Sequence, residues 1–204
     1  MTFRLLVSTM LFAVALPQSA TAQDGTSPAP RDTAGLPREL QPIDQALTGG
    51  LLNDPTLITW DVYGDALTSE VIVDPAYPGG GAARRLTQGR AGEVYASGMN
   101  IPILARVPAG ERVTVGFYAR TIASSAQDGN ARVGVRFQQN REPYPGFGAA
   151  TIEIGSEWDW YEVSAVADSD MRRDWIVAIQ FGLQAQTVEI GQAVVVSGVT
   201  SVLD

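Results

Sequence analysis

The chain has 204 residues, 45% of them hydrophobic and 18% charged, which is the composition of one globular domain with a short tail rather than of two domains, a fibrous repeat or a disordered chain. Its formal net charge is −8, with a pI of about 4.5, so a nucleic-acid-binding surface is not expected. The absence of Cys, His and Lys excludes Ser-His-Asp and Cys-His catalysis, Schiff bases on lysine, Walker-type phosphate loops and the usual structural zinc sites.

Residues 1–22 have the three parts of a secretory signal peptide. Arg4 precedes a short apolar run over residues 5–16, and Ala20-Thr21-Ala22 matches the small-x-small cleavage pattern. The apolar run is too short to span a bilayer, and no Cys follows it for lipid attachment. We therefore expect cleavage near Ala22 and a periplasmic or secreted protein without a membrane span. The alternative is a membrane-anchored N-terminus.

A linker and a short helix are expected next. Residues 23–40 are rich in Pro, Ser, Thr, Ala and Asp and show no apolar periodicity, which predicts a flexible linker. The folded domain is then expected to cover residues 41–204, with one short helix at about 42–47.

Beyond residue 55, the sequence indicates an all-β domain. Short runs rich in Val, Ile, Phe, Tyr and Thr alternate with turn sequences such as Pro78-Gly79-Gly80-Gly81. Ten strands in about 150 residues are typical of a two-sheet antiparallel β-sandwich, or jelly roll. The predicted strands are 57–63, 68–73, 83–89, 93–103, 112–120, 131–138, 148–154, 159–167, 175–184 and 187–197.

Alternation along these strands separates a core face from an outer face. In jelly-roll order, strands 83–89, 187–197, 112–120 and 159–167 form one sheet, and strands 93–103, 175–184, 131–138 and 148–154 form the other. The outer face of the second sheet then collects polar side chains, which make either a shallow groove or an ordinary solvated face with weak ion pairs. The expected core residues are Val113, Val115, Phe117, Ala119, Ala131, Val133, Val135, Phe137, Ala150, Ile152, Ile154, Trp158, Tyr161, Trp175, Val177, Ile179, Phe181 and Leu183.

Three segments resemble carbohydrate-binding modules of the galactose-binding-like jelly-roll superfamily, of the type of families four, nine and twenty-two. Residues 107–120 are similar to the family's "aG…v.l.fwaR" strand, residues 157–163 to its "eW..y.v" strand, and residues 179–191 to its closing pair of strands. The resemblance implies a sandwich that binds a polysaccharide or oligosaccharide on one sheet face, without catalysis and without a cofactor. Gly191 stands where many relatives place an Asp or Asn beside a structural calcium, which argues against a bound calcium.

The resemblance also implies a set of binding residues. The family's paired glutamines fall on Gln180 and Gln184, and its Arg and amide on an earlier strand fall on Arg132 and Gln138. Amides satisfy sugar hydroxyls as both donors and acceptors, Arg adds a planar fork, and an aromatic ring can cover the apolar face of a sugar. Phe147 and two tyrosines are candidates for that ring. The complete set of expected carbohydrate-binding residues, Phe147 apart, is Arg132, Arg136, Gln138, Gln180, Gln184, Tyr144, Tyr95 and Glu153.

Two other functions stay open at this point. A lone module of this type would act by itself or beside a separate carbohydrate-active enzyme, and the same sandwich without sugar binding would serve as an envelope protein-interaction module. The third hypothesis is a polysaccharide-active enzyme that uses Glu153 with Glu162 or Asp159 as acid and base. The jelly-roll order places these carboxylates on different sheets, which disfavours the enzyme.

Overall fold

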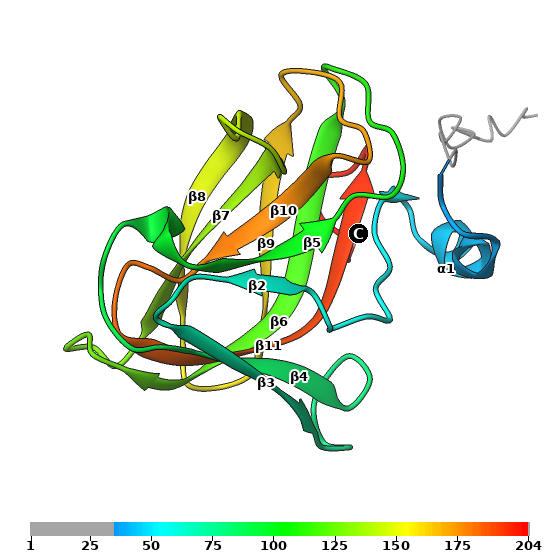
Figure 1. Cartoon of the computed structure of the whole chain (residues 1–204). Helices are drawn as coiled ribbons and strands as arrows, with labels where there is room; N and C mark the ends of the chain where they lie inside the picture. Colours follow the sequence, from blue (N-terminus) through cyan, green and yellow to red (C-terminus); the bar gives the residue numbers. More distant parts are fainter. Residues whose placement is uncertain (1–34, 204) are drawn as a thin grey trace, which may run out of the picture.

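The computed structural model describes residues 35–203, so the predicted signal peptide and most of the predicted linker lie outside the described residues. Two antiparallel sheets pack face to face, and one short helix lies beside them (Figure 1). The predicted fold class, an all-β two-sheet sandwich, is confirmed. No helix within residues 35–203 is long and apolar enough to cross a membrane.

The two sheets have the strand composition expected of a jelly roll. Sheet A has the order β3 (Leu67–Val73), β4 (Ala82–Gln88), β11 (Gln186–Ser197), β6 (Arg112–Ser124) and β9 (Asp159–Val166), and the short β1 (Gly50–Leu51) also pairs with β11. Sheet B has the order β2 (Asp61–Tyr63), β5 (Gly98–Pro102), β10 (Trp175–Gln180), β7 (Ala131–Gln139) and β8 (Gly146–Ile154). All eight strands that were assigned to a sheet from the sequence lie in the expected sheet. β1 was not predicted.

The core lies between the two sheets and follows the predicted alternation. Phe117 from sheet A and Phe137 from sheet B are fully buried there, as are the aliphatic residues two positions before each of them. Ala150, Ile152 and Tyr161 are only partly buried but pack against the same core. Leu183 is an incorrect core prediction: β10 ends at Gln180, and the turn that follows leaves Leu183 exposed.

The outer face of sheet A is largely covered. The 3-10 helix η1 (Arg38–Leu40) and the helix α1 (Gln41–Ala46), which matches the predicted helix, lie next to this face. Leu36 and Leu40 are buried against Val194 and Val196 of β11. Packed residues therefore begin several positions before the predicted domain start at Gln41.

A buried ion-pair cluster lies farther along the same outer face. The carboxylate of Glu189 is fully buried and accepts bonds from Arg85 Nη2 at 2.6 Å and Arg120 Nε at 2.8 Å. The Arg120 guanidinium lies 5.0 Å from the ring centre of Tyr77 and 4.9 Å from that of Trp158. Trp158 was expected in the core, and this prediction is wrong because the ring packs on Arg120 instead.

One predicted strand is partly replaced by a helical turn. Residues 93–103 were expected to be one strand, but the 3-10 helix η2 (Val94–Ala96) precedes β5. Gly182 makes this possible: it exchanges backbone hydrogen bonds with the segment, through Gly92 N to Gly182 O at 2.7 Å and Gly182 N to Val94 O at 3.2 Å. A Cβ atom at Gly182 would lie 1.9 Å from the Glu93 carbonyl oxygen, so only glycine permits this approach.

Candidate functional site

A cavity of about 660 Å³ lies over the outer face of sheet B. Its size is within the range of small-ligand sites, and its lining includes three tyrosines and four amide side chains. The lining residues are Asp61, Tyr63, Tyr95, Asn100, Arg136, Gln138, Asn140, Pro143, Tyr144 and Gln180.

The strand register builds the floor of the cavity from polar side chains separated by small ones. Asn100 of β5 pairs with Ala178 of β10, and Ala178 pairs in turn with Arg136 of β7. In the next row, Gln180 lies between two glycines, Gly98 and Gly134. Because these glycines have no side chains, the ring of Tyr63 can lie close to the sheet: a Cβ atom on Gly98 would be only 2.6 Å from the Tyr63 hydroxyl oxygen. The ring of Tyr63 therefore lies over the backbone of β5.

Two exposed tyrosines stand at the sides of this floor. Tyr95 on η2 is 62% exposed, and Tyr144 in the loop between β7 and β8 is 46% exposed. The loop is fixed by backbone bonds from Tyr144 N to Arg141 O at 2.7 Å and from Gln139 N to Pro145 O at 2.9 Å. Tyr144 has a φ of 57°, in the left-handed region that non-glycine residues rarely adopt. Such conformations are concentrated at functional sites, where the surrounding structure holds them.

Two buried polar atoms at the cavity have no hydrogen-bond partner among the described residues. They are Oδ1 of Asn100 and Nε of Arg136. The Asn100 side chain uses its other end, donating from Nδ2 to Asp61 Oδ2 at 3.4 Å. Buried polar groups are nearly always paired, and each unpaired one costs roughly 1–3 kcal/mol.

Tyr63 remains a neutral hydroxyl at neutral pH. Burial raises the pKa of Tyr63 above its usual value, and this effect exceeds the opposing effects of the Gln180 side chain and the Arg136 guanidinium. A protonated hydroxyl can both donate and accept, which is the property that pairs with another hydroxyl.

Five of the eight expected site residues are brought together by the fold. Arg136, Gln138, Gln180, Tyr144 and Tyr95 all line the same cavity. The residues come from β7, β10, η2 and the loop after β7, so they are far apart in sequence. Their part in binding sugar stays a prediction.

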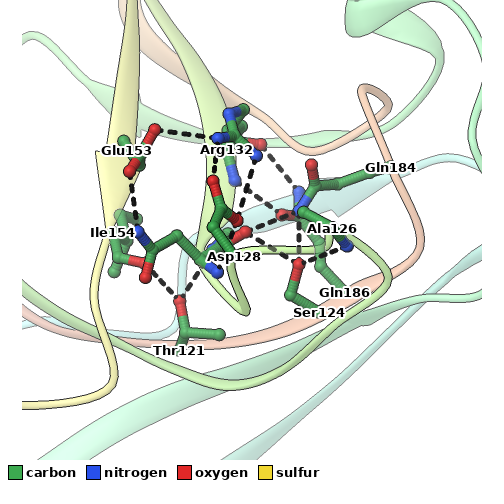
Figure 2. Close-up of polar contacts among 11 residues, drawn as sticks. Thr121, Ser124, Ala126, Asp128, Arg132, Glu153, Ile154, Gln184 and Gln186 are labelled. Atoms are coloured by element: carbon green, nitrogen blue, oxygen red, sulfur yellow. Dashed lines mark hydrogen bonds and ion pairs between the residues drawn. The ribbon is translucent and has the colours of Figure 1, made fainter.

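The other three expected residues lie outside the cavity and brace the turn between β6 and β7 (Figure 2). Arg132 pairs with Asp128 and, at 2.9 Å, with Glu153. Gln184 donates to Ser124 Oγ at 2.7 Å and to the Asn130 carbonyl at 2.9 Å. Because β10 ends at Gln180, the residue four positions later no longer lies on the sheet face.

Phe147 also differs from expectation. Its ring stacks on Phe137 with the ring centres 5.2 Å apart and also contacts Trp175 at 5.6 Å. Phe147 therefore packs against the core and offers no platform to a sugar.

Five lining residues were not in the predicted set: Asp61, Tyr63, Asn100, Asn140 and Pro143. Asp61 and Tyr63 alternate with Val62, which faces the core. Their place on the outer face could therefore have been predicted if this short strand had been assigned to sheet B. Asn100 likewise alternates with Met99 and Ile101, both in the core. Asn140 lies in the loop after β7, where no periodic pattern marks it.

The carboxylates considered for catalysis do not form a pair. Glu153 lies on β8 of sheet B, whereas Asp159 and Glu162 lie on β9 of sheet A. Glu162 accepts bonds from Trp160 Nε1 at 2.7 Å and Val202 N at 2.9 Å. In the described part of the chain, no group of three or more Asp and Glu side chains could hold a metal ion.

Comparison with known proteins bears on the fold. No family model and no curated protein matches the chain. Among solved structures, a candidate sugar binding protein from Bacteroides thetaiotaomicron matches with a TM-score of 0.51 at 13% identity, over 72% of this chain and 92% of that one. At 13% identity, this likeness shows a shared fold.

Two further solved structures have lower scores. The CBM22-1 xylan-binding domain of Paenibacillus barcinonensis Xyn10C has a TM-score of 0.49 at 13% identity, over 70% of this chain and 87% of that one. The N-terminal cellulose-binding domain of a Cellulomonas fimi β-1,4-glucanase has a TM-score of 0.46 at 16% identity, over 70% and 90%.

Proposed function

We propose that this protein is an exported, non-catalytic carbohydrate-binding protein that holds a polysaccharide or oligosaccharide on the outer face of sheet B. The observation that carries the proposal is the cavity floor, where the polar side chains of Asn100, Arg136 and Gln180 lie between the exposed rings of Tyr95 and Tyr144. A sugar has hydroxyls around its rim and apolar C–H faces, so it matches buried amides flanked by aromatic rings.

The shape of the site supports a chain of sugars rather than a single one. A second hollow of about 170 Å³ adjoins the first and shares Gln180 with it. It extends over Gly134 of β7 toward Ala150 and Thr151 of β8. The two hollows together form a groove that crosses the strands of sheet B, and we use the word groove for both.

Export is supported by the sequence of residues 1–22, with its charged start, apolar run and cleavage pattern. The non-catalytic assignment is supported by the separation of the candidate carboxylates onto different sheets. A separate carbohydrate-active enzyme is the partner that such a module would have.

Affinity electrophoresis tests the function directly. The protein without residues 1–22 would be run in gels containing xylan, β-glucan, mannan, pectin or alginate, beside the double variant Gln138→Ala/Gln180→Ala. We expect retardation by at least one polymer, and an affinity loss of roughly tenfold to a hundredfold in the variant, because each lost hydrogen bond contributes about 1 kcal/mol.

The matched control is Gln45→Ala/Gln127→Ala, which removes two exposed amides away from the groove. It should bind like the unchanged protein. If no polymer retards the unchanged protein, the proposal is wrong, and a protein-interaction module on the same fold becomes the better hypothesis.

A further inference from the structure

The half-buried arginines of the sandwich differ in their partners. Arg85 and Arg120 pair with Glu189, and Arg132 pairs with Glu153. Arg136 lines the groove but pairs with no carboxylate in the described part of the chain. Arg84 and Arg112, on sheet A, also have no carboxylate partner within the described residues, but they bond to the hydroxyls of Ser69 and Ser164. Arg136 is the arginine of this kind that lines the groove.

The position of this cation is fixed by the backbone around it. A Cβ atom on Gly146 would lie 2.9 Å from Arg136 Nη2 and 2.2 Å from the Phe137 carbonyl, so the guanidinium lies close against the first residue of β8. Its Nε is buried and unpaired, while the side chain as a whole remains partly exposed to the groove. A guanidinium held in this way binds most strongly to a planar anion that can accept two parallel N–H bonds, and a carboxylate is such an anion.

The neighbouring groups favour an anion at this end of the groove. Gln138, Gln180 and Tyr144 are neutral, and burial keeps the Tyr63 hydroxyl protonated by raising its pKa. The other charged lining residue is Asp61, three strands away across β5 and β10, which corresponds to roughly 14 Å between the backbones. Its carboxylate contacts Asn100, at the far side of the floor.

We propose that the groove binds an acidic polysaccharide, with the carboxylate of a uronic-acid residue seated on the Arg136 guanidinium. This inference rests on the proposed function and names the class of its ligand. The net charge of −8 opposes the approach of a polyanion, but only weakly at physiological salt, because the Debye length is about 8 Å and charges farther away than that are largely screened.

The test uses one polymer in two forms: a glucuronic-acid-bearing xylan and the same xylan after reduction of its carboxyl groups to alcohols. Polygalacturonate and alginate serve as further carboxylate polymers, and a sulfated galactan serves as an anion of different shape. Dissociation constants would be measured by titration calorimetry for the unchanged protein, Arg136→Gln, Arg136→Lys and Arg84→Gln. Arg84 is a matched control because it loses the same charge on β4 of sheet A.

We expect at least one carboxylate polymer to bind roughly tenfold to a hundredfold more tightly than its reduced form, with Arg136→Gln abolishing most of that difference. Arg136→Lys should recover only part of it, because lysine lacks the planar fork. Arg84→Gln should behave like the unchanged protein.

Three results would overturn the inference. Equal binding of the acidic and reduced xylans, with both lost in the glutamine groove variant Gln138→Ala/Gln180→Ala, would reject the acidic ligand and retain the proposed sugar binding. Preference for the sulfated polymer over every carboxylate polymer would reject the uronic-acid carboxylate. Absence of binding to any polymer would reject both proposals together.

Discussion

Glu189 and Asn100 are both buried polar side chains, but they have opposite surroundings. Both oxygens of Glu189 accept bonds from guanidinium groups. Asn100 Oδ1 has no partner within the described residues. The first side chain is therefore part of the internal structure of sheet A, whereas the second lines the cavity on the outer face of sheet B.

Removal of the Glu189 carboxylate should destabilise the fold and leave the groove unaffected. Glu189→Ala leaves Arg85 and Arg120 without their shared buried partner. Both guanidinium groups are partly exposed and Arg85 keeps its pair with Glu70, so we expect a loss of about 1–3 kcal/mol. Urea unfolding would measure the loss, with polymer binding recorded at low urea. A change in unfolding free energy below about 1 kcal/mol would contradict this view of the cluster.

Among the elements, η2 shows how a contact from another strand overrides a local preference. Residues 93–97 contain Val94 and Tyr95, which favour a strand, but the segment turns because its backbone bonds to Gly182. This turn lifts Tyr95 from the plane of sheet B to the side of the groove. The placement of one aromatic ring thus depends on a glycine almost ninety residues later.

Gly182→Ala should therefore weaken binding through η2. The new methyl group would meet the Glu93 carbonyl at 1.9 Å, so the turn must move and carry Tyr95 with it. We expect several-fold weaker polymer binding and a stability loss of about 1–3 kcal/mol, measured by titration and thermal unfolding. Gly155→Ala is the control, because no neighbouring atom lies within 4 Å of a Cβ there. Equal effects of the two substitutions would show that the contact with Glu93 does not position the turn.

At the scale of the whole molecule, the sequence was sufficient to predict the sandwich and the sheet to which eight strands belong. Strict alternation, as in Val113, Val115 and Phe117, identifies the buried face of a strand without reference to any other strand. The assignment of strands to the two sheets came from the assumed jelly-roll order. The groove was predicted less well. Gln184 was assigned to the sheet face because the apolar alternation continues to Leu183, beyond the actual end of β10.

The three expected site residues that lie outside the groove do so for a common physical reason. Arg132, Glu153 and Gln184 are the same residue types that would bind a sugar, and only their partners show that they brace a turn. Two of those partners, Asp128 and Asn130, lie in the loop between β6 and β7, whose course the strand pattern does not predict. A sequence pattern can place a side chain on a sheet face, but it does not show which neighbouring groups already form hydrogen bonds or ion pairs with that side chain.

The covered face of sheet A leads to a prediction about the boundary of the domain. A chain that begins at Gln41 lacks Leu36 and Leu40, which are buried against β11. Compared with a chain that begins at Gly35, it should lose roughly 2–5 kcal/mol of stability, since each buried leucine contributes about 1.5–3 kcal/mol. Urea unfolding of both chains would measure this, and polymer binding should be the same for both. Equal stability would show that residues 35–40 add nothing to the fold.

The same covered face has a practical consequence for attachment. Leu36 and Val202, from the two ends of the described chain, belong to one apolar cluster on sheet A, and the groove opens on sheet B. A support or fusion partner joined at either end of residues 35–203 is therefore attached on the side of sheet A, opposite the groove. The polymer-facing side would stay accessible on a sensor chip or in a chimera, whichever end is used.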